Sequence, residues 1–173
     1  MRTLDRERTA LVVVDVQEAF RPAVPDFDDV VENTRRLMEA ARILGVPVVV
    51  TEQYPKGLGR TVDELGEVEP VEKSSFSAAR ADGFDLDGRE QALVCGIETH
   101  VCVSQTTHDL LERGVEVHVA SDAVSSRTTA NKEVGLHKME QSGAIVTSVE
   151  TALFELLGVS GTDEFKQVQG LIK

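Results

Sequence analysis

Residues 10–15 read Ala10-Leu11-Val12-Val13-Val14-Asp15, a run of apolar and mainly β-branched side chains that ends at a carboxylate. A short, unbroken apolar run of this kind is typical of a strand whose two faces are both buried. Similar runs recur at residues 46–50, 92–95, 115–120 and 144–147. Strands buried on both faces need covering layers above and below, so we expect helices on either side of one sheet.

Helical periodicity fills the gaps between these strands. The spacing of apolar residues predicts helices over residues 28–44, 103–111, 130–141 and 151–157. Strands that alternate with helices imply right-handed crossovers and a mainly parallel sheet, which is a three-layer α/β/α, Rossmann-like fold. Residues 52–81 are rich in glycine and proline and are expected to form a long excursion over one sheet edge. The tail at 158–173 is expected either to pack on a neighbour or to fray.

Length, composition and charge indicate the number of domains and the classes of partner that we expect. A chain of 173 residues predicts one domain over residues 1–173, and 41% hydrophobic residues suffice for a sizeable core. The net charge of −12 repels phosphate backbones and anionic membrane surfaces. Nucleic acid and membranes are therefore disfavoured as partners, and we expect a small-molecule substrate.

Cysteine and histidine usage points to a reducing compartment and to no bound metal. Cys95 and Cys102 are too few for a disulfide-stapled scaffold. The N-terminal residues lack the apolar segment of a secretory signal, and no apolar run approaches the roughly 18 residues of a membrane-spanning helix. The four histidines are not spaced like zinc ligands. We expect a cytoplasmic protein without a cofactor.

Two residues fall near the carboxyl edge of the expected sheet, where parallel α/β folds bind their ligands. Asp15 directly follows its strand, and Cys102 lies past a turn after the strand at 92–95, at the start of a predicted helix. A helix N-terminus stabilises a thiolate, which would give Cys102 the environment of a nucleophile. The ordinary alternatives are that Cys102 is a small buried apolar residue and that Asp15 caps a turn.

Lys73 stands within the irregular stretch and by itself reads as a solvated surface residue. Together with Asp15 and Cys102, however, it could take part in catalysis. A cysteine nucleophile needs a base to take its proton, and a nearby cation lowers the pKa of the thiol and keeps the base ionised. An aspartate, a lysine and a cysteine together would do this without a histidine.

Four segments carry a resemblance to a known family: VVVDVQEAF at 12–20, TEQYPKGLG at 51–59, EKSSFS at 72–77, and GIETHVCVSQTTHDLLERGVEVHVASDAVSSR at 96–127. They resemble the isochorismatase-like cysteine hydrolase superfamily, which includes nicotinamidases and N-carbamoylsarcosine amidohydrolases. The resemblance runs over residues 9–155. It is closest to the metal-independent branch called isochorismatase domain-containing proteins.

The resemblance implies a catalytic triad of Asp15, Lys73 and Cys102. It also implies a cis peptide bond between Ile97 and Glu98, with the backbone N–H groups of Glu98 and Cys102 as the oxyanion hole. The family's sheet has six strands in the order 3-2-1-4-5-6, and the family implies a homo-oligomer. That strand order places Asp15 and the Cys102 loop on either side of the point where the connections diverge.

The positions at which this chain departs from the family pattern limit which reactions and substrates we expect. Nicotinamidases carry a metal-binding D-x-H motif after the second strand, where this chain has Thr51-Glu52-Gln53-Tyr54. A catalytic metal and a nicotinamide substrate are therefore disfavoured. True isochorismatases lack the nucleophilic cysteine, so the presence of Cys102 disfavours isochorismate hydrolysis and favours acyl transfer through a thioester.

The expected function is hydrolysis of a C–N bond in an amide, ureido or carbamoyl-type compound. The alternatives are a binding or scaffolding protein without turnover, and a redox-responsive thiol protein. Five residues near the expected site are candidates for the substrate pocket: Gln17, Phe20, Gln53, Tyr54 and Phe76. Each has an ordinary alternative as a core, lid or solvated residue.

Overall fold

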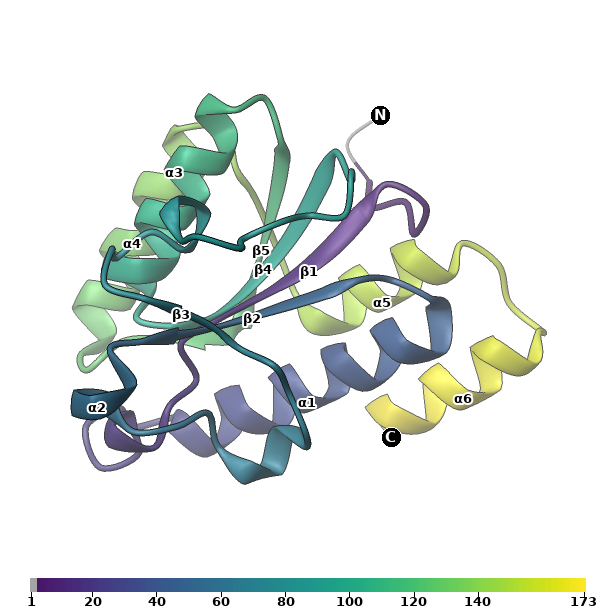
Figure 1. The fold of residues 1–173 in the computed structure, drawn as a ribbon. Coiled ribbons are helices and arrows are strands. Elements are labelled where there is room, and N and C mark those ends of the chain that lie inside the picture. Colours follow the sequence, from purple (N-terminus) through teal and green to yellow (C-terminus); the bar gives the residue numbers. More distant parts are fainter. Residues whose placement is uncertain (1–2) are drawn as a thin grey trace.

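The computed structural model describes residues 3–173 and contains one six-stranded sheet (Figure 1). The strands stand in the order β3-β2-β1-β4-β5-β6, and every neighbouring pair is parallel. Their bounds are β1 Thr9–Val14, β2 Val48–Gln53, β3 Val71–Lys73, β4 Gln91–Ile97, β5 Glu116–Ser125 and β6 Ile145–Thr147. The three-layer fold expected from the sequence pattern and the strand order implied by the family resemblance are confirmed.

Helices cover both faces of the sheet, as the apolar strands require (Figure 1). One face is covered by α1 Phe27–Leu44, α5 Val149–Leu157 and α6 Asp163–Ile172, and the other by α3 Ser104–Glu112 and α4 Thr129–Gln141. Side chains alternate across β1: Leu11 and Val13 enter the first core, and Val12 and Val14 enter the second. In the part of the chain that the structure describes, no helix is long and apolar enough to cross a membrane.

Local sequence explains where the last three helices begin. The side chains of Thr128, Ser148 and Thr162 accept hydrogen bonds from backbone N–H groups three residues further on, at the starts of α4, α5 and α6. Such caps satisfy an N–H group that has no partner inside the helix. The helix expected at 151–157 therefore begins two residues earlier, at Val149.

Strand β3 and helices α2 and α6 were not expected from local pattern. Strand β3 lies inside the stretch predicted to be irregular, because its three residues are too few to show a period and it forms by pairing with β2. The same stretch holds the short helix α2 Pro55–Leu58. The tail packs rather than frays: α6 lies against α1 and α5, with Val168 fully buried.

The sheet order fixes where a site can form. Strands β1 and β4 are adjacent, but the chain leaves β1 towards β2 and leaves β4 towards β5, on the opposite side. Connections that diverge in this way leave a crevice at the carboxyl ends of the two strands. Asp15 follows β1 directly, and a π-helical turn, Thr99–Val103, follows β4.

Candidate active site

Asp15 is fully buried at the end of β1 and is held by two donors. Its backbone has a φ of 52°, a left-handed conformation that few residues other than glycine adopt. Oδ1 accepts a hydrogen bond from Thr51 Oγ1 at 2.7 Å, and Oδ2 accepts one from Lys73 Nζ at 2.7 Å. A strained backbone at a carboxylate with both oxygens occupied is typical of a site in which orientation matters.

Lys73 ends β3, and its ammonium group is completely enclosed. Both Lys73 and Asp15 have side chains with 0% exposure, so they form a buried ion pair. Besides Asp15, Lys73 Nζ donates to Gln53 Oε1 at 2.7 Å, to Phe76 O at 3.0 Å and, less closely, to Ser75 O at 3.3 Å. The expectation that Lys73 by itself would be a solvated surface residue is therefore wrong, because tertiary structure folds the segment after β3 back over the ammonium.

Cys102 lies in the π-helical turn that leads into α3 and is 6% exposed. Burial and, to a smaller extent, the neighbouring carboxylate of Asp15 raise the pKa of its thiol to about 12, against the lowering effect of the Lys73 ammonium. The expectation that the surroundings of Cys102 stabilise its thiolate is therefore wrong. Cys102 does not begin the helical segment, because the turn starts three residues earlier, and the loss of hydration outweighs the nearby cation.

The backbone between β4 and Cys102 has a special geometry. The peptide bond between Ile97 and Glu98 is cis, at the position for which the family resemblance implied one. Gly96 precedes it with a φ of 116°, and a Cβ atom there would lie 2.0 Å from Val14 O. Only glycine fits this close approach of β4 to β1.

The Glu98 side chain forms hydrogen bonds with Arg127. Its Oε1 accepts from Arg127 N at 3.1 Å and from Arg127 Nε at 3.0 Å, so the loop after β5 is tied to the loop that carries Cys102. On the far side, α4 approaches closely, since a Cβ atom on Gly135 would lie 2.9 Å from the backbone of Thr99 and His100. The turn is thus held from two directions.

The five candidate pocket residues separate into four groups. Gln17 is buried, donates to Gln53 O and Gly59 O and accepts from Gln53 N, so its whole amide is engaged within the protein. Gln53 Oε1 accepts a hydrogen bond from the Lys73 ammonium, so Gln53 belongs to the hydrogen-bond network around the proposed triad. Phe20 packs against the core cluster on the α1 face, whereas Tyr54 and Phe76 are 59% and 52% exposed.

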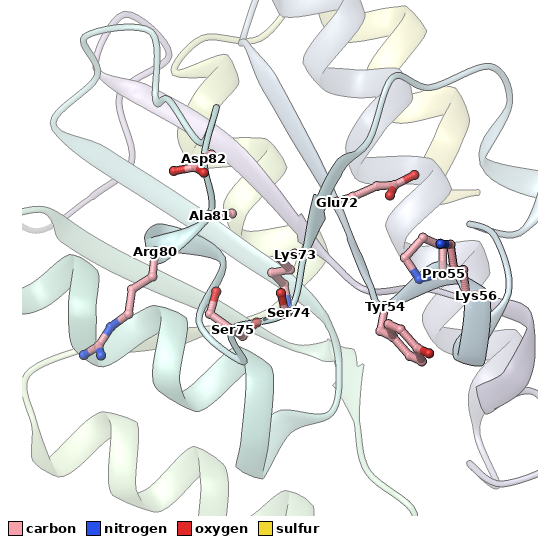
Figure 2. A pocket seen from close by; sticks show the side chains of 10 residues that line it. All are labelled: Tyr54, Pro55, Lys56, Glu72, Lys73, Ser74, Ser75, Arg80, Ala81 and Asp82. Carbon is pink, nitrogen blue, oxygen red and sulfur yellow. Dashed lines mark hydrogen bonds between the residues drawn. The ribbon is translucent and has the colours of Figure 1, made fainter.

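A cavity of about 510 Å³ opens beside this network. Figure 2 shows Tyr54 and Lys56 on one side of it and Arg80 and Asp82 on the other, with Lys73 between them. The complete lining is Tyr54, Pro55, Lys56, Glu72, Lys73, Ser74, Ser75, Arg80, Ala81 and Asp82. The lining includes neither Asp15 nor Cys102, and the Lys73 side chain is 0% exposed, so the cavity borders the triad without entering it; of the five candidate pocket residues it includes Tyr54.

The residues present do not fit the metal of the nicotinamidases. Gln53 stands in the segment where that motif would lie, and its amide is committed to Lys73 Nζ and, through Nε2, to Ser74 O at 3.0 Å. Among residues 3–173, no three or more His, Cys, Asp or Glu side chains gather as a metal site would require.

Sequence reasoning missed Thr51, which donates to Asp15 and is fully buried. It was visible only as part of the segment that lacks the D-x-H motif. The signal that could have found it is its place in β2, two residues before Gln53 and therefore on the same face of the strand.

The chain is similar to known proteins in both sequence and structure. Residues 9–151 match the family model described as the isochorismatase domain. The chain is 44% identical over 172 residues to isochorismatase domain-containing protein 2A of Mus musculus, a match covering 96% of this chain and 84% of that protein. The structure of MAR1 ribonuclease from Caenorhabditis elegans is similar, with a TM-score of 0.91 and 43% identity over 98% of this chain and 92% of that chain. A structure of YcaC from Pseudomonas aeruginosa, with hexane-2,5-diol and covalent acrylamide, has a TM-score of 0.86 and 25% identity over 98% and 91% of the two chains.

Proposed function

The chain belongs to the isochorismatase family, and on that premise we propose that it is a small-molecule hydrolase that cleaves a C–N bond through a thioester on Cys102. The substrate would be an amide, a ureido compound or a carbamoyl-type compound. The family match supports hydrolase activity. The observation that carries the finer proposal is the buried Asp15–Lys73 pair, 2.7 Å between Oδ2 and Nζ, near enough to Cys102 for the Asp15 carboxylate to raise the pKa of the thiol and for the Lys73 ammonium to lower it.

In the first half of the proposed reaction, Asp15 takes the proton of the Cys102 thiol while the sulfur attacks the substrate carbonyl carbon. The oxyanion that forms accepts hydrogen bonds from the backbone N–H groups of Glu98 and Cys102. When the C–N bond breaks, the proton on Asp15 passes to the leaving amine and a thioester remains.

In the second half, Asp15 takes a proton from water as the water oxygen attacks the thioester. The C–S bond then breaks, the sulfur regains its proton from Asp15, and the carboxylic or carbamic acid leaves. Lys73 stays charged throughout and stabilises the carboxylate and the developing negative charge on sulfur.

The raised pKa of the Cys102 thiol agrees with this scheme. A thiol with a pKa of about 12 is protonated at neutral pH, so it needs a base in contact with it, and Asp15 is that base. The same protonation argues against a redox-responsive thiol, because peroxide oxidises the thiolate. Cys95 packs in the core on the opposite face of the sheet, where it cannot serve as a resolving partner.

Other properties stay predictions. A homo-oligomer is what the family resemblance implies, and light scattering of the purified protein measures it. The cytoplasmic location is likewise an expectation, open to fractionation of the host cell. A solved relative is described as a ribonuclease, but the net charge of −12 disfavours a polyanionic substrate here, so RNA belongs in the test as a competing outcome.

The experiment is a search for an acyl adduct on Cys102. The protein is mixed with amides, ureido compounds and carbamoyl compounds, quenched in acid at short times, and mapped by mass spectrometry, with amine release measured in parallel. We expect an adduct on Cys102 and released amine, both absent in Cys102→Ala. A short RNA is tested alongside.

Acrylamide, the compound bound covalently in the YcaC structure, provides a reactivity check that does not depend on finding a substrate. We expect it to modify Cys102 far more slowly in Asp15→Asn than in the wild type. Equal acrylamide rates in the two proteins, or RNA cleavage without any acyl adduct, would refute the proposed function. Tight binding of an amide without turnover would favour the binding-protein alternative.

A further inference from the structure

We propose that β2 is the positioning element of the triad: Thr51 holds the Asp15 carboxylate, Gln53 holds the Lys73 ammonium, and together they keep this buried pair ionic. This inference rests on the function proposed above. It adds two positioning residues that the family resemblance did not supply as members of the triad.

The sheet order brings these residues together. Strand β2 lies between β1, which leads to Asp15, and β3, which ends at Lys73. Thr51 and Gln53 are two residues apart, so their side chains leave the same face of β2. Thr51 reaches the carboxylate on one side and Gln53 reaches the ammonium on the other, each at 2.7 Å.

The direction of each hydrogen bond matches the charge that it meets. Thr51 Oγ1 donates to Asp15 Oδ1, which leaves Oδ2 for Lys73. The Gln53 amide has a fixed orientation, because Nε2 donates to Ser74 O at 3.0 Å and Oε1 then faces Lys73 Nζ. The anion meets a donor and the cation meets an acceptor.

A buried ion pair has a neutral alternative, in which the proton moves from the ammonium to the carboxylate. Burial favours that alternative because it removes two charges from a poorly solvated site. A hydroxyl that donates to the carboxylate and a carbonyl that accepts from the ammonium both favour the charged forms. Thr51 and Gln53 therefore preserve the carboxylate that must accept the thiol proton.

The charged groups that raise or lower the pKa of the Cys102 thiol, besides burial, include Asp15, Lys73 and Glu98. Glu98 is engaged by Arg127 through Oε1. Replacing Thr51 or Gln53 should therefore act mainly through the Asp15–Lys73 pair.

The test is the pH dependence of Cys102 alkylation by iodoacetamide, measured by peptide mass spectrometry, which needs no substrate. The wild-type rate should be level over the pH range in which Asp15 accepts the thiol proton and should fall below that range. Asp15→Asn should lose the level range, because only the thiolate then reacts and its fraction falls about tenfold per pH unit throughout. Thr51→Val is isosteric but removes the donor. We expect it to move the midpoint of the fall upward by about one pH unit, a tenfold change in the ionisation equilibrium.

Three further variants complete the design. Thr51→Ser keeps a hydroxyl donor and should restore the wild-type midpoint. Gln53→Glu adds a second carboxylate that competes for the ammonium, so the midpoint should also rise. Thr107→Val is the matched control, because Thr107 is fully buried near the start of α3 and its hydroxyl has no hydrogen-bond partner among the described residues.

The outcomes separate the two proposals. Urea midpoints measured for every variant show which substitutions merely destabilise the fold. If Thr51→Val leaves the acid midpoint where it is in the wild type, or shifts it no more than Thr107→Val does, the positioning role is refuted and the proposed function stands. If the wild-type profile has no level range that Asp15→Asn removes, Asp15 is not the base and both proposals fail.

Discussion

Breaking the Asp15–Lys73 pair from one side should cost far more stability than removing it entirely. Both side chains are 0% exposed, and the ammonium and carboxylate lie 2.7 Å apart, so neither charge can turn to solvent when its partner is lost. Removing one member of such a buried pair costs about 3–5 kcal/mol, whereas replacing both is often close to neutral. Lys73→Met keeps the aliphatic length and leaves Asp15 as an uncompensated buried charge.

The stability that the double variant loses depends on the contacts that remain after both substitutions. Lys73→Met also deprives Gln53 Oε1 and Phe76 O of a donor, and Asp15→Asn keeps the shape while removing the charge. We therefore expect Asp15→Asn/Lys73→Met to lose some stability, but at least about 2 kcal/mol less than the sum of the two single losses.

Urea denaturation of the four proteins at pH 7, analysed as a double-mutant cycle, measures this coupling. Single losses that add to within about 0.5 kcal/mol would refute the reasoning, since they would mean that the pair is not energetically coupled. On a substrate found by the adduct search, each single variant should abolish turnover. The double variant should be little worse than either, because the residues act as one unit.

Further predictions concern the backbone, the thiols and metal. Gly96→Ala should destabilise the fold by more than about 3 kcal/mol, because its Cβ would lie 2.0 Å from Val14 O, and a wild-type urea midpoint would contradict this. Iodoacetamide at pH 7 should modify Cys102 slowly and Cys95 more slowly still. Both thiols have a pKa raised to about 12, mainly by burial, but Cys102 retains 6% exposure. Equal modification rates of the two cysteines in peptide mass spectra would count against this. Because the folded-state pKa of Cys95 lies above its ordinary value of 9.0, its stabilising effect is complete below about pH 9 and is lost as the pH rises towards 12. Cys95→Ala should lessen that alkaline loss, by about 1.4 kcal/mol per pH unit at most, in urea titrations from pH 8 to 11. Chelators should leave stability and activity unchanged because residues 51–54 lack the D-x-H motif, and stoichiometric zinc or iron in untagged protein would argue otherwise.

The strands and helices with strong patterns were predictable from sequence because their side chains are apolar wherever both faces are buried. Strand β1 is the clearest case, since all six of its residues are buried. Strand β3 was not predictable, because Val71–Lys73 is partly exposed and too short for periodicity. It exists because β2 offers an unpaired edge, and a pairing partner is a property of the fold rather than of the segment.

The candidate site divides in the same way. The sequence alone supplied Asp15 and Cys102 through their places after strands, and chemistry joined Lys73 to them. It could not supply the ionisation state of the thiol. Burial, which depends on the whole packed structure, raises the pKa of Cys102 and reverses the expectation drawn from the predicted helix N-terminus and the lysine.

By itself the sequence determined the strands and helices with strong patterns, the fold class and the residues with reactive groups, because these follow from side-chain polarity and spacing along the chain. Only the tertiary structure decided which groups meet. Thr51, Gln53 and Lys73 reach Asp15 or one another across segments of 20 to 58 residues, and those contacts exist because the sheet order places β2 between β1 and β3. A hydrogen bond depends on distances of a few ångströms in space, and separation along the chain carries no information about them until the strands have paired.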